Sequence, residues 1–212
     1  MSVITVKRVA ALDEARTQAI RSIYSTSFPP AERMEFSQLL NSVNKGRLLA
    51  YTAEDDQTVL GIAFLLPLSF GHIYMLDYLA TAETARNAGL GSRLLQGIAA
   101  DLALANAAGI IFEVEPPEEA DTEEQALRRR RIGFYQRNGA RIVEGAEGYR
   151  MPDQSKPGSL RMILMWLPLD QQAEMISGQD LRDCIVSIYT EDYDRQPDDP
   201  LLQSILQTIP LP

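Results

Sequence analysis

Hydrophobic positions along the chain switch between two periods, and each switch marks an expected change of element. Short runs rich in β-branched and apolar residues predict strands over residues 3–9, 47–54, 58–67, 72–81, 110–115, 141–143 and 160–167. Apolar residues spaced three and four apart predict helices over 12–24, 36–43, 90–108, 122–138, 181–188 and 202–209. This order predicts an α/β (α+β) fold, in which one mixed sheet has helices on both faces.

Breakers between these segments predict where the elements end. Ser27-Phe28-Pro29-Pro30 ends the first helix, because the residue before a proline disfavours helical backbone. Gly109 is expected to terminate the long helix before it, as glycine commonly does. Thr122 is expected to cap the following helix, with Gln125 reaching back in a capping box. Residues 145–159, which contain several glycines and prolines, are expected to form a long loop.

The character of the chain changes after Pro168, and this change predicts two parts. Residues 1–169 are expected to form one domain. Residues 170–212 are expected to form a C-terminal helical extension, which packs either on that domain or on a partner subunit. The sequence leaves a homodimer open.

The charge balance narrows the classes of partner. The chain has 212 residues and a formal net charge of −9 at pH 7. A broad nucleic-acid-binding surface is therefore not expected, since neutralising phosphates supplies most of that affinity. An acidic surface mildly favours a cationic amine as substrate through electrostatic steering.

The chain has one cysteine, Cys184, and one histidine, His72. No internal disulfide and no two-histidine metal site can form, so no metal is expected. Cys184 lies at an apolar helix position and is expected to be a packing residue, and His72 is expected at a sheet edge or on the surface. No signal peptide or membrane-spanning apolar run is evident, so a cytoplasmic protein without membrane contact is expected.

The segment from Leu79 to Leu95 is the strongest candidate for a ligand site. It reads as a strand end, a short loop and the start of a long helix, with Arg86-Asn87-Ala88-Gly89-Leu90-Gly91 at the junction. Glycines let a ligand approach the backbone closely. The free N–H groups at a helix start bind phosphate well, and Arg86 adds a positive charge. A tight turn that only caps a surface helix is the structural alternative.

This segment lacks the marks of other phosphate loops. No Lys-Ser or Lys-Thr pair follows the glycines, and no third glycine stands at the dinucleotide spacing. Arg-x-x-Gly-x-Gly after Leu79-Ala80-Thr81 instead resembles the pyrophosphate-binding segment of the GNAT superfamily of N-acetyltransferases. The resemblance covers roughly residues 3–168, with its motifs in 72–140. It implies the GNAT fold: a mixed, mostly antiparallel sheet of about seven strands, flanked by helices on both faces.

The resemblance also implies acetyl-CoA as cosubstrate. The backbone of Leu79 and Thr81 is expected to pair with the pantetheine amides where two parallel strands separate. The full set of residues expected to bind the coenzyme is Leu79, Ala80, Thr81, Arg86, Asn87, Ala88, Gly89, Leu90, Gly91, Ser92 and Tyr135.

A second motif, Phe134-Tyr135 shortly before Gly139, strengthens the resemblance. In GNAT enzymes a tyrosine at this place often acts as general acid for the leaving thiolate, and here it is Tyr135. The alternative is a pair of core aromatics at a helix end. Many relatives have an asparagine and a small residue one and two turns earlier. This chain has Arg128 and Arg131 there, so contacts to the coenzyme are expected to differ.

A general base is needed to accept the proton of an attacking amine. Asp77, Glu113 and Glu115 are the candidates, and strand alternation places Glu113 and Glu115 on one face. Glu113 is favoured because an apolar strand would raise the pKa of its carboxyl group. A paired or solvated structural carboxylate is the alternative for each. Direct attack by the amine requires no covalent acyl-enzyme.

The remaining expectations concern the surroundings of the site. Arg128-Arg129-Arg130-Arg131 is expected to pair mainly with the acidic loop 118–124. The acceptor is expected between residues 28–33 and the loop 145–159, near Tyr149 and Arg150. A small-molecule amine, amino acid, peptide N-terminus and aminoglycoside all stay open, as do longer acyl donors. A non-catalytic CoA-binding sensor or assembly module of GNAT fold, and another kind of nucleotide binder, are the alternative functions.

Overall fold

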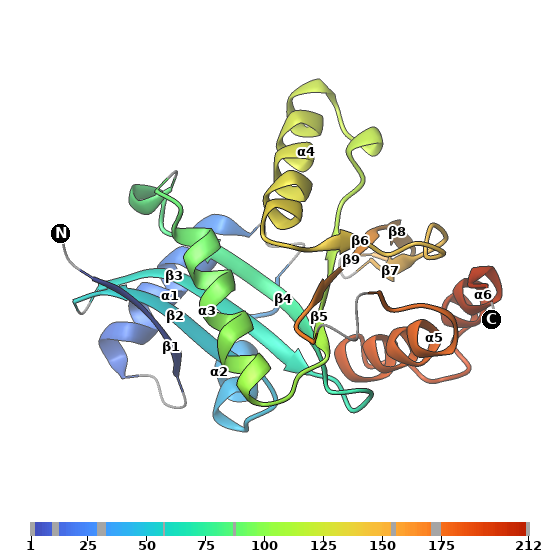
Figure 1. The fold of residues 1–212 in the computed structure, drawn as a ribbon, viewed down its shortest axis with the longest axis horizontal. Coiled ribbons are helices and arrows are strands. Elements are labelled where there is room, and N and C mark those ends of the chain that lie inside the picture. The colour runs from blue at the N-terminus through green and yellow to red at the C-terminus, as the bar shows by residue number, and fades with distance from the viewer. Residues whose placement is uncertain are drawn as a thin grey trace. The chain divides into compact units, whose positions relative to one another are not determined.

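The computed structural model describes residues 3–9, 13–28, 33–56, 58–86, 88–153, 156–170 and 175–210. The strands are β1 Ile4–Val9, β2 Leu49–Asp55, β3 Thr58–Pro67, β4 Ile73–Thr81, β5 Gly109–Val114, β6 Arg141–Ile142, β7 Arg150–Pro152, β8 Ser159–Arg161 and β9 Ile163–Pro168 (Figure 1). The helices are α1 Glu14–Ser27, α2 Phe36–Asn44, α3 Leu90–Leu104, α4 Thr122–Arg137, α5 Gly178–Ser187 and α6 Pro200–Thr208. Shorter turns are η2 Glu83–Ala85 and η3 Pro117–Glu119, both 3-10, and the π-helical η4 Ile188–Asp192.

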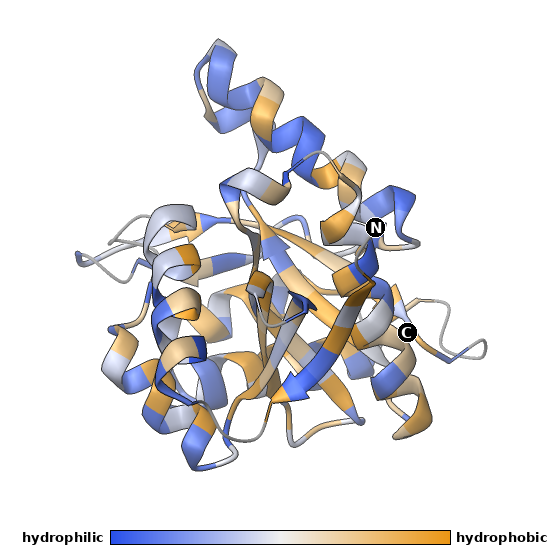
Figure 2. Cartoon of the chain, turned by 90° about the vertical axis from the view of Figure 1, so that its left-hand side faces the viewer, coloured by the Kyte–Doolittle hydropathy of each residue, from blue (hydrophilic) through white to orange (hydrophobic). Residues whose placement is uncertain are grey.

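The seven-stranded sheet has the order β1-β2-β3-β4-β5-β9-β6, and β7 and β8 form a separate pair. The pairs β1–β2, β2–β3, β5–β9 and β6–β9 are antiparallel, whereas β4 and β5 are parallel. Figure 2 shows the strands largely in the orange of hydrophobic residues and most of α4 in the blue of hydrophilic ones. The mixed, mostly antiparallel sheet expected from the sequence is confirmed.

The chain divides into two compact units. The first is Met1–Pro67 with Leu76–Leu104, and the second is Leu68–Met75 with Ala105–Pro212. Strand β4 therefore contributes residues to both. The boundary expected between residues 169 and 170 stays a prediction.

In the first unit, helix α3 packs closely on the edge strand β1. A Cβ atom on Gly97 would lie 2.7 Å from Cβ of Val6, closer than real side chains approach. Leu94, Ile98 and Leu102 of α3 are buried. Glycine at position 97 is thus what permits this approach of helix to strand.

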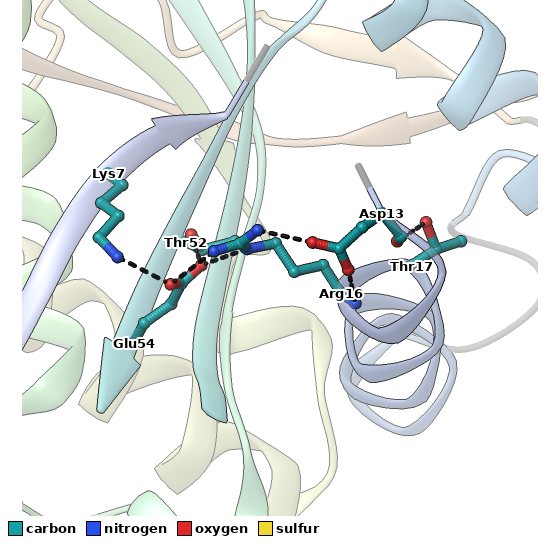
Figure 3. Close-up of polar contacts among 6 residues, drawn as sticks. All are labelled: Lys7, Asp13, Arg16, Thr17, Thr52 and Glu54. Atoms are coloured by element: carbon teal, nitrogen blue, oxygen red, sulfur yellow. Dashed lines mark hydrogen bonds and ion pairs between the residues drawn. The ribbon is translucent and has the colours of Figure 1, made fainter. Parts of the chain in front are cut away.

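A buried carboxylate ties α1 to the strands of the same unit (Figure 3). The side chain of Glu54 on β2 is 1% exposed and accepts hydrogen bonds from Arg16, Lys7 and Thr52. Arg16 is bound in turn by Asp13, whose side chain also accepts from the Arg16 backbone N–H and so caps α1. The Arg16 hydrogen bond is the main cause that lowers the pKa of Glu54 to about 2. Glu54 is therefore ionised and fully paired.

In the second unit, Gly109 begins β5 and does not end α3, so the expected helix end is corrected. Helix α3 ends at Leu104, and Asn106 then adopts a left-handed conformation with φ of 60°. A Cβ on Gly109 would lie 2.2 Å from the indole of Trp166 on β9. The glycine is required by this long-range contact.

Two other local expectations are corrected as well. Asp121 caps α4, because its side chain accepts from the N–H groups of Glu123 and Glu124, and Thr122 is the first helical residue. The expected loop 145–159 contains β7 and the start of β8. The last strand of the sheet accordingly begins at Ile163.

The C-terminal helices pack their apolar faces inward. Leu181, Cys184 and Ile185 of α5 are buried, as are Leu202 and Ile205 of α6. Burial raises the pKa of Cys184 to about 12, which agrees with a packing role for its thiol. Among the described residues, none of the helices has the length and apolarity needed to cross a membrane.

Candidate functional site

The expected phosphate segment lies in the first unit and has the local geometry of an exposed helix start. Strand β4 ends at Thr81, η2 follows, and α3 begins at Leu90. Gly89 has φ of +72°, and a Cβ atom at this position would have no described residue within 4 Å, its two chain neighbours aside. Its carbonyl accepts from the N–H of Arg93. The backbone before α3 is therefore open on the side where glycine lacks a side chain, which fits a bound phosphate.

The residues predicted to bind the coenzyme differ in exposure. Arg86, Ala88 and Gly89 are exposed, and Leu79, Thr81, Gly91 and Ser92 are partly exposed. Ala80 and Leu90 are buried, so only their backbone groups are available to a ligand. Asn87 lies outside the described residues.

The parallel ladder between β4 and β5 is short. It joins Ile73, Tyr74 and Met75 to residues 109–111, and β4 continues from there to Thr81 within the first unit. Asp77, one candidate base, lies in this continuation and is partly exposed. Its role stays a prediction.

Tyr135 lies near the end of α4 in the second unit. Its side chain is 9% exposed, and its ring centroid is 4.2 Å from that of Phe112 on β5. Burial raises its pKa to about 12, while Arg131 acts weakly in the opposite direction. The phenol is therefore protonated at neutral pH and has a proton to donate.

Glu113 on β5 has the most unusual environment among the candidate residues. It is partly exposed, and its carboxylate accepts hydrogen bonds from the hydroxyls of Tyr149 and Tyr193. Burial raises its pKa to about 7, against the opposite effect of the two tyrosine hydrogen bonds. Asp192 adds a smaller upward shift through charge repulsion. A carboxylate with this pKa is well suited to exchange a proton at neutral pH.

Glu115 does not share the environment of Glu113, contrary to the expected alternation. Strand β5 ends at Val114, so Glu115 lies outside the strand and the alternation of side chains along a strand does not fix its direction. Its carboxylate instead forms ion pairs of 2.8 Å with Arg128 and Arg131 of α4. Glu115 is thus a structural partner of the two arginines, and the sequence did not separate it from Glu113.

The arginines of α4 match their expected partners only in part. Arg128 pairs with Glu124 at 2.8 Å and also donates to the carbonyl of Pro116. Glu118 and Glu119 pair with Arg161 of β8, which is not one of the four consecutive arginines. The acidic loop is therefore paired with arginines from two elements, α4 and β8.

The expected acceptor region contains an aromatic group in the first unit. The ring centroids of Tyr24, Phe28 and Tyr78 lie 5.0 to 5.6 Å apart. Tyr24 donates to the carbonyl of Met34, whose N–H donates to Tyr78. Residues 29–32 lie outside the described residues.

Sequence reasoning placed Tyr149 near the acceptor but missed Tyr193. Tyr193 follows η4 and lies between the two expected helices 181–188 and 202–209, in a stretch for which no element or site was expected. Its ring lies 5.6 Å from that of Tyr189, four positions earlier. The spacing of these two tyrosines after an apolar helix was the available signal.

Part of the chain is similar to a known family. Residues 46–139 match the family model described as an acetyltransferase (GNAT) domain. The Bacillus subtilis (strain 168) protein YjbC, which bears the name of an acetyltransferase, is 29% identical over 148 residues, or 69% of this chain and 70% of that protein.

Solved structures show the same fold. One from Bacteroides thetaiotaomicron, assigned to the GNAT acetyltransferase family, is 25% identical, has a TM-score of 0.73, and covers 91% of this chain and 100% of its own. An aminoglycoside 6'-N-acetyltransferase complexed with coenzyme A is 14% identical, has a TM-score of 0.62, and covers 78% and 97% of the two chains. Residues 46–139 therefore match a GNAT acetyltransferase domain, and the chain is similar in sequence and fold to acetyltransferases of that family, which supports an acyl-CoA-dependent N-acyltransferase.

Proposed function

We propose that this enzyme moves an acetyl group from acetyl-CoA to a primary amine by direct attack, with Glu113 as general base and Tyr135 as general acid. The observation that supports this proposal most is the environment of Glu113. Residue Glu113 on β5 is partly exposed, but its carboxyl group is buried and has a pKa of about 7. Structural carboxylates in this protein, such as Glu54, instead pair with cations, which lower their pKa.

The helix start at Leu90 is the proposed seat of the coenzyme's pyrophosphate. Gly89 bares the backbone, the first N–H groups of α3 have no partner within the helix, and Arg86 is exposed beside them. The backbone of Leu79 and Thr81 is proposed to pair with the pantetheine arm. A solved protein of the same fold is described as complexed with coenzyme A, which supports acetyl-CoA as cosubstrate.

Bound acetyl-CoA supplies an acetyl group activated as a thioester. Glu113 accepts a proton from the amine, directly or through one water, so that the nitrogen lone pair is free to attack. The hydroxyl of Tyr135 donates its proton to the departing sulfur, which therefore leaves as a thiol. The second proton, which the nitrogen loses as the amide forms, restores the phenol. Binding both reactants side by side lowers the entropic part of the barrier.

The acceptor is proposed to be an amine that is cationic in solution. The chain has a net charge of −9, and a carboxylate that takes up the amine's proton matches a positively charged substrate. Aminoglycosides are one such class, and a neighbour of the same fold is named for them, but its identity of 14% supports the fold alone. Small amines, amino acids and peptide N-termini stay within the proposal.

The test is an acceptor screen with acetyl-CoA, in which release of free thiol is followed for each amine. We expect acceptor-dependent thiol release that falls about 100-fold in Glu113→Gln, because the amide cannot accept the proton. Glu115→Gln is the matched control, since in the described part of the chain the ion pairs of this neighbouring carboxylate are with Arg128 and Arg131.

The alternative is a GNAT-fold module that binds coenzyme A as a sensor or in assembly. Tight binding of acetyl-CoA, without thiol release for any amine tested, would favour it. Competition between coenzyme A and ATP for the free protein separates both from another kind of nucleotide binder.

A further inference from the structure

Two tyrosines from distant parts of the second unit meet on the carboxylate of Glu113. The hydroxyl of Tyr193, which follows η4, lies 2.7 Å from Oε1 and 2.7 Å from Oε2. The hydroxyl of Tyr149, which precedes β7, bonds to Oε1. Burial is the main cause that holds the pKa of both phenols well above their ordinary value, so both are protonated donors.

We propose that Tyr193, supplied by the C-terminal helices, is a positioning residue of the active site, which orients the Glu113 carboxylate and leaves Oε2 as the oxygen that takes up the amine's proton. The proposal rests on the proposed role of Glu113 as base. If Tyr193 has this role, the segment after β9 contributes to catalysis as well as to packing.

The two carboxylate oxygens of Glu113 differ in the hydrogen bonds they accept, and this difference favours Oε2 as the oxygen that receives the proton. Oε1 already accepts from Tyr149, and Tyr193 has one proton, which it donates to either oxygen. When Tyr193 also donates to Oε1, Oε2 keeps its lone pairs for the incoming proton. Once Oε2 is protonated, the oxygen of Tyr193 can accept from it, because a hydroxyl is both donor and acceptor. One side chain thus serves both protonation states.

The backbone around Tyr193 is held by contacts that do not involve Glu113. The π-helical turn η4 follows α5. π-helical turns are rare in proteins, and those that occur are often found at functional sites. The hydroxyl of Tyr189 donates to the carbonyl of Arg150. The carboxylate of Glu191 accepts from the N–H and the hydroxyl of Ser69, the latter at 2.7 Å. The turn that carries Tyr193 is therefore held in place by hydrogen bonds of Tyr189 and Glu191, independently of Glu113.

Among the described residues, the charged and titratable groups that interact with Glu113 are Tyr149, Tyr189, Tyr193 and Asp192. Tyr149 and Tyr193 donate to it, and Asp192 repels its charge. Loss of the Tyr193 hydroxyl removes a charge-assisted hydrogen bond, which favoured the ionised form. In Tyr193→Phe the pKa of Glu113 should therefore rise.

The experiment follows the side-chain carboxyl carbon of Glu113 by NMR over a pH series in isotope-labelled protein, with the signal assigned by its loss in Glu113→Gln. In Tyr193→Phe we expect the midpoint to move up by about one pH unit. Tyr189→Phe is the matched control: Tyr189 also interacts with Glu113 electrostatically, but its hydroxyl donates to a backbone carbonyl and not to the carboxylate, so the midpoint should move much less than in Tyr193→Phe.

A second variant guards against a failure of Tyr193→Phe to fold. Site-specific 3-fluorotyrosine at position 193 keeps the ring and the hydroxyl but makes the phenol a stronger donor, so the Glu113 midpoint should move down. An unchanged midpoint in both variants would overturn the proposal.

The pH profile of kcat/KM then connects the carboxylate to catalysis. Its acidic limb should shift in Tyr193→Phe by the same amount as the NMR midpoint. If the NMR midpoint of Glu113 shifts but the acidic limb of the kcat/KM profile does not, Glu113 is not the base, and Tyr193 has no positioning role in catalysis. The titration itself needs no acceptor, so the hold of Tyr193 on the carboxylate is decided even if the proposed function fails.

Discussion

The guanidinium of Arg16 spans both carboxylate oxygens of Glu54, with Nε 3.0 Å from Oε1 and Nη2 3.3 Å from Oε2. Removing the arginine leaves the buried charge with Lys7 and Thr52 as its side-chain partners among the described residues. We expect Arg16→Ala to lower the free energy of unfolding by about 2–4 kcal/mol, measured by urea denaturation at pH 7.

Lys7→Ala is the control for this network. Lys7 also binds Glu54, but its side chain is 45% exposed, so its removal should cost about 1 kcal/mol or less. The pKa of Glu54 is lowered to about 2 from 4.5, so its stabilisation is complete above pH 4.5 and is lost as the pH falls toward 2. Equal costs for the two variants would contradict the dominant role given to Arg16.

Two helical glycines should respond to alanine with opposite signs. A methyl group on Gly97 of α3 would lie within 3 Å of Val6, so Gly97→Ala should destabilise the protein by about 1–3 kcal/mol. On Gly133 of α4 the methyl meets only the flexible end of Arg137 at 3.2 Å. Gly133→Ala should therefore stabilise by about 0.5–1 kcal/mol through helix propensity. Thermal unfolding of both variants checks the pair.

Gly89 should be required for the coenzyme rather than for folding. Gly89→Val introduces a β-branched side chain at the proposed pyrophosphate seat, and affinity for acetyl-CoA should fall roughly tenfold or more. Gly46→Val is closely matched, because Gly46 has φ of +70° and also nothing within 4 Å of its Cβ position. The two variants should lose similar stability, while only Gly89→Val loses coenzyme binding by calorimetry.

Tyr135→Phe tests the proposed proton donor. The phenol is protonated at neutral pH, because burial raises its pKa to about 12. Its removal should lower kcat about 100-fold and leave the affinity for acetyl-CoA near that of the wild type. Steady-state kinetics and equilibrium binding on the same preparation separate the two effects. Unchanged turnover would remove the acid role of Tyr135.

The carboxylate of Glu113 should leave a signature in stability as well as in activity. Its pKa is about 7 in the folded chain and 4.5 in the unfolded one, so its contribution is fully present below pH 4.5 and is lost as the pH rises to 7. The wild type should therefore lose about 3 kcal/mol relative to Glu113→Gln between pH 4.5 and 7.5. Urea denaturation of both proteins across this range measures the difference. A constant difference would mean that Glu113 titrates normally.

Local signals were sufficient where one residue decides an element and insufficient where a distant partner does. Gly139 directly follows the expected helix 122–138, and in the structure it has φ of +96° directly after the cap Asn138 of α4. Gly109 looked the same by its place in the sequence, but its role comes from Trp166, on a strand far along the chain. The capping error was one residue, because Asp121 and Thr122 are both good N-cap residues.

The candidate site shows the same division. Glu113 was singled out because it interrupts an apolar strand, and its raised pKa agrees with that reasoning. Its partner Tyr193 is 80 positions away, and no local pattern connects the two. Glu115 was grouped with Glu113 by alternation, which failed because β5 ends one residue too early.

Positions 109 and 166 are in contact, but they differ in how well they tolerate substitution. A smaller residue at 166 opens space around the glycine, yet a Cβ at 109 would still lie 2.8 Å from the carbonyl oxygen of Leu167, which every residue type retains. Mutating Trp166 therefore cannot rescue a side chain at 109. In a library randomised at both sites, survivors should vary at 166 and show only glycine at 109.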